Sequence, residues 1–218
     1  MGTLLIESAE RADVDMFVQT SVAGLERHLA RSDYGTGLTF DAYAAARLLI
    51  EARLRTSTLR RWTVLRPVTL MESYLPPKAR AMFPWLAEGR LDSVHSTDMP
   101  IQLFSVVDIA RFAVAALRRD PDRFDRQIIE LNGDEPHVAH IAAALSDATG
   151  IRITYRAPSA TDALRDGMLA GVAHSQEWAN QIGYGAPSPE DVHTTWGIKP
   201  TPFTERARAD ADLFDVAR

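Results

Sequence analysis

Residues 40–66 read FDAYAAARLLIEARLRTSTLRRWTVLR and decide the fold class. The first part, Phe40 to Thr58, is rich in alanine, leucine, arginine and glutamate, which favour a helix. The second part, Trp62 to Arg66, is a short apolar run that Pro67 stops, which predicts a strand. This alternation of helix and strand indicates βαβ units and a parallel sheet.

The same alternation continues on both sides of this stretch. Further helices are predicted over residues 3–11, 78–88, 109–119 and 138–149. Further strands are predicted over residues 14–22, 127–131 and 152–155. Residues 25–38 are predicted to be mostly loop, and 91–95 are expected to pair with 101–106 as short strands. The chain is therefore an α/β protein with a mostly parallel sheet and flanking helices.

The composition changes after Pro158. Beyond it come four prolines and the aromatic residues Trp178, Tyr184 and Trp196. We predict that residues 1–158 form the α/β core and that residues 159–218 form a helical cap of the same domain.

The composition also excludes several classes of protein. The chain has 218 residues, no cysteine, and 24 Lys and Arg against 29 Asp and Glu, a net charge of −5. This rules out thiol catalysis, disulfides and thiolate metal sites, and it argues against nucleic-acid binding. His137 and His140 lack further ligands nearby, so we expect no metal. No stretch is apolar enough for a membrane span or a signal peptide, so we expect a soluble, cytoplasmic protein.

Five segments in order carry a family resemblance. They are residues 16–24, 40–55, 62–72, 106–112 and 129–135, which read MFVQTSVAG, FDAYAAARLLIEARLR, WTVLRPVTLME, VVDIARF and IELNGDE. Their order resembles the NmrA-like branch of the atypical short-chain dehydrogenases/reductases. The resemblance covers nearly the whole chain and implies a Rossmann-like fold with a C-terminal helical cap.

One motif of that family is absent from the sequence. Such families begin with a strand, a G-x-x-G-x-x-G turn and a helix whose N-terminus faces the cofactor pyrophosphate. Here Gly35 and Gly37 are followed by Phe40 where a third glycine would fall. The resemblance therefore implies a truncated Rossmann-like fold that begins near the helix before the fourth strand. We expect NAD(P) binding to be weak or absent, with no other cofactor.

Such a truncation would expose the strand over residues 16–20 as a sheet edge. The backbone donors and acceptors of that edge need partners. We expect a homodimer in which two copies of this edge pair antiparallel, which is the simplest solution under two-fold symmetry. A partner polypeptide or rearranged local segments are the alternatives.

Thr20, Ser21, Tyr43 and Arg47 are similar to the Ser/Tyr/Lys catalytic arrangement of the wider superfamily. Tyr43 and Arg47 are four residues apart on the predicted helix and share a face, and a cation beside a phenol favours the phenolate. Such a tyrosine can exchange a proton with a substrate oxygen. Arg47 stands where the family has lysine. In the alternative interpretation Tyr43 packs under a loop and Arg47 pairs with a local carboxylate.

The expected substrate wall follows the strand over residues 62–66, because ligands lie at the carboxyl ends of strands in open α/β sheets. The residues expected there are Pro67, Val68, Met71, Glu72 and Tyr74, with aromatic surface from Phe83, Trp85 and Trp178. Glu72 is either a base or an exposed loop carboxylate. The aromatic residues either line a ligand pocket or form the core of the cap.

These features support three functions, each with a small-molecule ligand. The first is a cofactor-independent enzyme that cyclises, dehydrates or isomerises a carbonyl-bearing hydrophobic or aromatic metabolite by proton transfer. The second is a regulatory protein that senses a ligand without turnover, as some NmrA-like members are. The third is an NAD(P)-dependent oxidoreductase that requires a partner chain.

Overall fold

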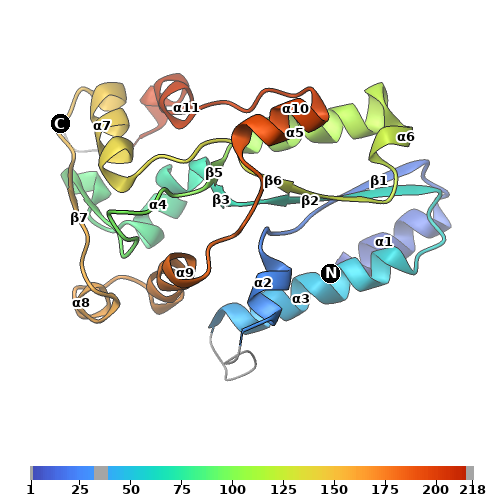
Figure 1. Cartoon of the computed structure of the whole chain (residues 1–218), viewed down its shortest axis with the longest axis horizontal. Helices are drawn as coiled ribbons and strands as arrows, with labels where there is room; N and C mark the ends of the chain where they lie inside the picture. Colours follow the sequence, from blue (N-terminus) through green and yellow to red (C-terminus); the bar gives the residue numbers. More distant parts are fainter. Residues whose placement is uncertain (1, 32–38, 215–218) are drawn as a thin grey trace.

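The central sheet has three parallel strands. The computed structural model describes residues 2–31 and 39–214, and the side chains of these except at 39 and 40. Strands β1 (Met16–Thr20), β2 (Arg61–Pro67) and β6 (Gln127–Leu131) lie in the order β1-β2-β6 (Figure 1). Both pairings are parallel, which confirms the predicted α/β fold with a parallel sheet. The central strand β2 is buried from Trp62 onward.

Helices cover both faces of this sheet. The α-helices of the described residues are α1 (Gly2–Arg11), α2 (Leu25–Leu29), α3 (Thr39–Arg55), α4 (Lys78–Met82), α5 (Val106–Val114), α6 (Pro121–Phe124), α7 (Val138–Thr149), α8 (Ala160–Arg165), α9 (Ala170–Gln181), α10 (Pro189–Trp196) and α11 (Phe203–Ala209). One face is covered by α1 and α3, which pack on Trp62 and Val64, and the other by α5 and α10, which pack over Leu65 (Figure 1). The side chains of β2 therefore alternate between two apolar layers.

Two short parallel ribbons extend the fold beyond the sheet. β3 (Thr69–Leu70) pairs with β5 (Leu103–Phe104), and β4 (Arg90–Asp92) pairs with β7 (Thr154–Arg156). The predicted pairing of residues 91–95 with 101–106 is therefore wrong. The backbone of the segment after β4 is bound instead by side chains of α9, as described below, and is not available for a hairpin.

Two local predictions failed, the first because of tertiary contacts and the second because of a proline. Residues 25–29 form helix α2 and not a loop, since Leu25 is buried and the buried His28 Nε2 lies 2.8 Å from Asp41 Oδ1 on α3. The rest of the predicted loop, residues 32–38, lies outside the described residues. The helix predicted over 78–88 ends at Met82 and resumes as a 3₁₀ turn over Leu86–Glu88, because Pro84 cannot donate a backbone hydrogen bond.

Strand β1 forms one edge of the sheet. Among the described residues it pairs with β2 on one side and with no strand on the other. Phe17 and Val18 remain half-buried. In the described part of the chain no helix is long and apolar enough to cross a membrane.

Candidate active site

A cleft of about 370 Å³ lies where β1 and β2 end. Because these strands are parallel, their carboxyl ends meet at one edge of the sheet, where open α/β sheets bind ligands. The described lining residues come from the strand ends, from α3, from the segment after β2, from α9 and from two loops. They are Ser21, Val22, Tyr43, Pro67, Val68, Thr69, Leu70, Ser73, Tyr74, Lys78, Met82, Phe83, His95, Gly171, Ser175, Gln176 and Tyr184. This mainly apolar lining with a few polar groups is typical of small-molecule sites.

The structure brings Tyr43 and Arg47 together, and Tyr43 lines the cleft. The guanidinium carbon of Arg47 lies 4.8 Å from the centroid of the Tyr43 ring, a cation–π contact. Arg47 Nη1 also lies 3.5 Å from the backbone oxygen of Thr20. Thr20 is exposed and contributes its carbonyl, not its hydroxyl, to this group. Tyr43 is 40% exposed, so a ligand in the cleft can reach its phenol.

Ser21 is the buried polar group at the end of β1. It is 8% exposed, and its hydroxyl has no hydrogen-bond partner among the described residues. Its backbone N–H donates to Leu65 O at 2.8 Å, which continues the β1–β2 ladder and fixes the residue in the cleft wall. Because buried hydroxyls are normally paired, Ser21 is a group that a ligand would satisfy.

Four of the predicted substrate-wall residues line the cleft. Pro67 and Val68 form the end of β2, and Tyr74 and Phe83 stack with ring centroids 4.6 Å apart and planes 3° apart. Burial raises the pKa of Tyr74, so this phenol stays protonated. These residues provide a flat apolar wall.

The other four lie outside the cleft. Met71 is buried in the core formed with α7. Glu72 is no base at the cleft, because its carboxylate accepts hydrogen bonds from the Ser105 hydroxyl and the Val106 N–H and so caps α5. The Ser105 hydroxyl oxygen in turn accepts a hydrogen bond from Val107 N in the first turn of α5.

The two tryptophans predicted for the substrate wall pack against other side chains of the protein and do not line the cleft. Trp85 stacks against the guanidinium of Arg90 at 4.6 Å. Trp178 is 3% exposed and packs behind Tyr184, with ring centroids 5.1 Å apart. Trp178 therefore supports the cleft wall from behind and does not face its interior.

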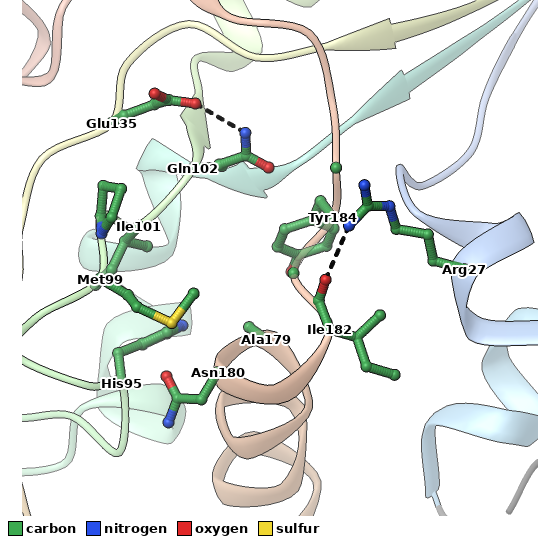
Figure 2. Close-up of a pocket in the computed structure, with 13 residues that line it drawn as sticks. Arg27, His95, Met99, Ile101, Gln102, Glu135, Ala179, Asn180, Ile182 and Tyr184 are labelled. Atoms are coloured by element: carbon green, nitrogen blue, oxygen red, sulfur yellow. Dashed lines mark hydrogen bonds between the residues drawn. The ribbon is translucent and has the colours of Figure 1, made fainter. Parts of the chain in front are cut away.

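A second cavity of about 260 Å³ is lined in part by residues of the cleft (Figure 2). Tyr184 and His95 line both spaces. Tyr184 is held by a 3.0 Å hydrogen bond between its hydroxyl and Thr69 Oγ1, and burial raises its pKa. Burial lowers the pKa of His95 to about 4, so this imidazole is neutral at physiological pH. The two residues that line both spaces are thus uncharged.

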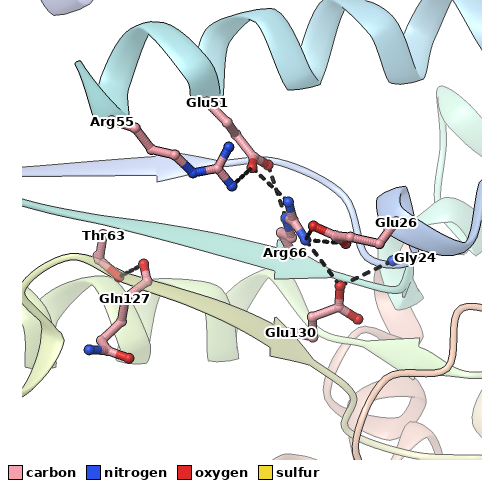
Figure 3. Close-up of polar contacts among 8 residues, drawn as sticks. All are labelled: Gly24, Glu26, Glu51, Arg55, Thr63, Arg66, Gln127 and Glu130. Atoms are coloured by element: carbon pink, nitrogen blue, oxygen red, sulfur yellow. Dashed lines mark hydrogen bonds and ion pairs between the residues drawn. The ribbon is translucent and has the colours of Figure 1, made fainter. Parts of the chain in front are cut away.

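A buried ion network fixes the strand ends beside the cleft (Figure 3). Arg66, next to Pro67, binds Glu51 on α3 at 2.7 Å, Glu26 on α2 at 2.6 Å and Glu130 on β6 at 3.3 Å. Burial lowers the pKa of Arg66, but its hydrogen bonds to Glu51 and Glu26 outweigh this and the net shift is upward. The network joins β2 to α2, α3 and β6 beside the cleft.

Comparison with known proteins finds matches among solved structures. No protein-family profile and no curated protein matches the chain. An NADPH-dependent quinone oxidoreductase from Escherichia coli matches with a TM-score of 0.70 and 22% identity, over 95% of this chain and 72% of that chain. A Citrobacter sp. triphenylmethane reductase complexed with NADP(H) matches with a TM-score of 0.70 and 16% identity, over 96% of this chain and 70% of that chain. NmrA, a negative transcriptional regulator, in complex with NADP, matches with a TM-score of 0.64 and 16% identity, over 98% of this chain and 68% of that chain.

The chain has the fold of NmrA and SDR-type reductases. Identities this low show the fold alone, and the truncation of that fold stays a prediction. The expectation that no cofactor takes part is wrong, because proteins of this fold were crystallised with NADPH, NADP and NAD. That expectation depended on a missing glycine motif, which concerns only the pyrophosphate end of a dinucleotide.

Sequence reasoning missed two of the polar residues of the cleft, namely His95 and Gln176. They lie on a loop and on α9, far along the chain from the strand ends. No motif marks them, and only the packing of α9 against residues 94–96 brings them to the site.

Proposed function

We propose that this chain is an NAD(P)H-dependent reductase that acts on flat, apolar carbonyl compounds. The observation that carries the proposal is the cleft at the ends of β1 and β2, which combines the unpaired Ser21 hydroxyl with the Tyr43–Arg47 pair. The fold supports it, since matched structures include an NADPH-dependent quinone oxidoreductase and a triphenylmethane reductase.

The residues at the strand ends fit the nicotinamide end of such a cofactor together with a carbonyl substrate. Ser21 offers a buried hydroxyl that needs a partner, and Pro67 and Val68 offer an apolar surface for a flat ring. We assign no residues to the pyrophosphate, because the sequence holds no G-x-x-G-x-x-G motif.

The chain's own residues would position the substrate oxygen and supply its proton. When bound, the nicotinamide supplies a hydride to the carbonyl carbon. Tyr43 donates its phenolic proton to the oxygen, and the positive charge of Arg47 over the ring stabilises the resulting phenolate. Ser21 donates a hydrogen bond to the same oxygen as its negative charge develops. The stacked pair Tyr74 and Phe83 holds the apolar part of the substrate and excludes water.

The test is oxidation of NADPH or NADH by the 218-residue chain with menadione, a flat dicarbonyl compound, followed by absorbance. Tyr43→Phe is expected to lower kcat/KM by about a hundredfold or more, because the general acid is lost. Tyr155→Phe is the matched control, since Tyr155 is 45% exposed on β7 and does not line the cleft. Absence of turnover by the wild-type chain, or full turnover by Tyr43→Phe, contradicts the proposal.

A ligand sensor without turnover is the second candidate. It is favoured by one feature, the Arg47 guanidinium, which lies over the ring of Tyr43 in the place of the lysine of the catalytic arrangement. Tight binding of menadione with unchanged nucleotide absorbance would support this candidate over the reductase.

A further inference from the structure

The side-chain amide of Gln176 is fixed in one orientation at the far wall of the cleft. Gln176 lies on α9 and is 3% exposed. Its Oε1 accepts a hydrogen bond from the backbone N–H of Val94 at 2.7 Å. Because a backbone N–H can only donate, the amide oxygen must face Val94, and the amide nitrogen Nε2 must face away from it.

The wall that carries this amide is itself held firmly. Asn180, one turn further along α9, donates from Nδ2 to Val94 O at 2.8 Å and accepts from the backbone N–H of Ser96 at 2.8 Å. Three hydrogen bonds thus join α9 to the backbone of residues 94–96. The position of Gln176 is therefore set before any ligand binds, which lowers the entropic cost of using it.

Nε2 of Gln176 is a buried donor that finds no acceptor within the described residues. Among the described residues that line the cleft, Ser21 is the other one whose buried side-chain polar atom has no hydrogen-bond partner. Buried polar side-chain atoms are paired in the large majority of cases, so two such groups around one cleft point to a ligand that pairs with both. Ser21 belongs to the strand-end wall and Gln176 to the α9 wall, so the ligand must reach both walls.

The charge of the lining further restricts the ligand. Lys78 is the only Asp, Glu, Lys or Arg among the described lining residues, and it is exposed. His95, beside Gln176 in the lining, is neutral because burial lowers its pKa to about 4. The interior of the cleft therefore favours uncharged groups, and an amide N–H pairs well with a carbonyl oxygen.

We propose that Gln176 determines substrate specificity by binding a second carbonyl oxygen, so that the substrate class is an uncharged, flat dicarbonyl compound. The inference rests on the proposed function, which places the oxygen of the reacting carbonyl at Ser21 and Tyr43. Gln176 Nε2 binds the oxygen remote from the reacting carbon and sets which of the two carbonyls faces Tyr43.

The experiment is calorimetric titration of the full chain, without nucleotide, with three probes: menadione with two ring carbonyls, α-tetralone with one, and naphthalene with none. The chain has no cysteine, so the quinone cannot form thiol adducts. Gln176→Glu keeps an acceptor for Val94 N–H and removes the donor. Gln181→Glu is the matched control, because Gln181 is exposed on the same helix.

Gln176→Glu is expected to weaken menadione binding by about tenfold or more and to leave naphthalene binding unchanged, because only one hydrogen bond is lost. Protonation of the introduced carboxyl at low pH restores a donor and is expected to recover part of the menadione affinity. Gln181→Glu is expected to change nothing. These titrations omit nucleotide, so failure of the reductase assay leaves their result intact.

Three results would overturn the inference. The first is menadione binding by Gln176→Glu within twofold of wild type. The second is an equal loss for all three probes, which would assign Gln176 to the structure of the wall. The third is a wild-type chain that does not bind menadione.

Discussion

Replacing Arg66 by methionine is expected to destabilise the protein strongly, because Arg66 holds a buried carboxylate. The Arg66 side chain is 2% exposed and that of Glu51 is 0% exposed. Arg66 donates to both carboxylate oxygens of Glu51, from Nε at 3.0 Å and from Nη2 at 2.7 Å (Figure 3). Methionine has a similar length and fills most of the space, so the main change is the loss of charge and donors.

The expected loss of stability comes mainly from the Glu51 carboxylate, which is left buried. Without Arg66, the Glu51 carboxylate keeps an ion pair with Arg55 at 3.3 Å, and the Arg55 side chain is 43% exposed. The side chain of Glu26 is 65% exposed and returns to solvent at little cost. Removing one partner of a buried ion pair typically costs about 3–5 kcal/mol, and we expect Arg66→Met to lie in this range.

Urea unfolding followed by circular dichroism measures this cost. Arg66→Met combined with Glu51→Leu is expected to recover most of the lost stability, because the double change removes the uncompensated charge. The control is Arg60→Met, which breaks an exposed pair with Asp15 and is expected to change stability by less than about 1 kcal/mol. A loss below about 1 kcal/mol for Arg66→Met, or no recovery in the double variant, would refute this reasoning.

Four further outcomes are expected. Burial lowers the pKa of His95 from 6.5 to about 4, so below about pH 6.5 the unfolded chain takes up a proton that the folded chain does not. As the pH falls from about 6.5 to about 4, the unfolding free energy therefore decreases by up to about 1.4 kcal/mol per pH unit. His95→Asn is expected to flatten this slope in urea titrations. Burial also raises the pKa of Glu130, so its ionisation destabilises the fold, and Glu130→Gln is expected to raise the urea midpoint at neutral pH but not near pH 3. Ser188 caps α10 in a reciprocal capping box, and Ser188→Ala should cost about 1 kcal/mol in the same assay. We propose that the free edge of β1 pairs two copies into a homodimer; sedimentation at micromolar concentration is expected to give a dimer, and a monomer would speak against it.

Local sequence patterns predicted the elements that local forces determine. Residues 127–131 and 138–149 were predicted with the observed bounds, because a short apolar run and a glycine stop at Gly150 are sufficient signals. The predictions failed where contacts with residues far away in the sequence determine the local structure. Helix α2 depends on the contact of His28 with Asp41, and the segment after β4 depends on side chains of α9.

The same division holds for the site. Pro67 and Val68 were expected at the cleft because ligands lie at the carboxyl ends of parallel strands. Ser21 and Tyr43 were added by the family resemblance. Gln176 could not be predicted, because its role depends on a hydrogen bond to Val94, 82 residues away in the sequence. Glu72 was misplaced because its sequence position did not show that it caps α5.

The most direct test of the central claim is a crystal structure of the chain with menadione and NADPH. We expect the quinone in the cleft at the ends of β1 and β2, with one oxygen bonded to Ser21 and Tyr43 and the other to Gln176. A quinone bound in the second cavity, beside Arg27, with this cleft left to solvent, would contradict the central claim.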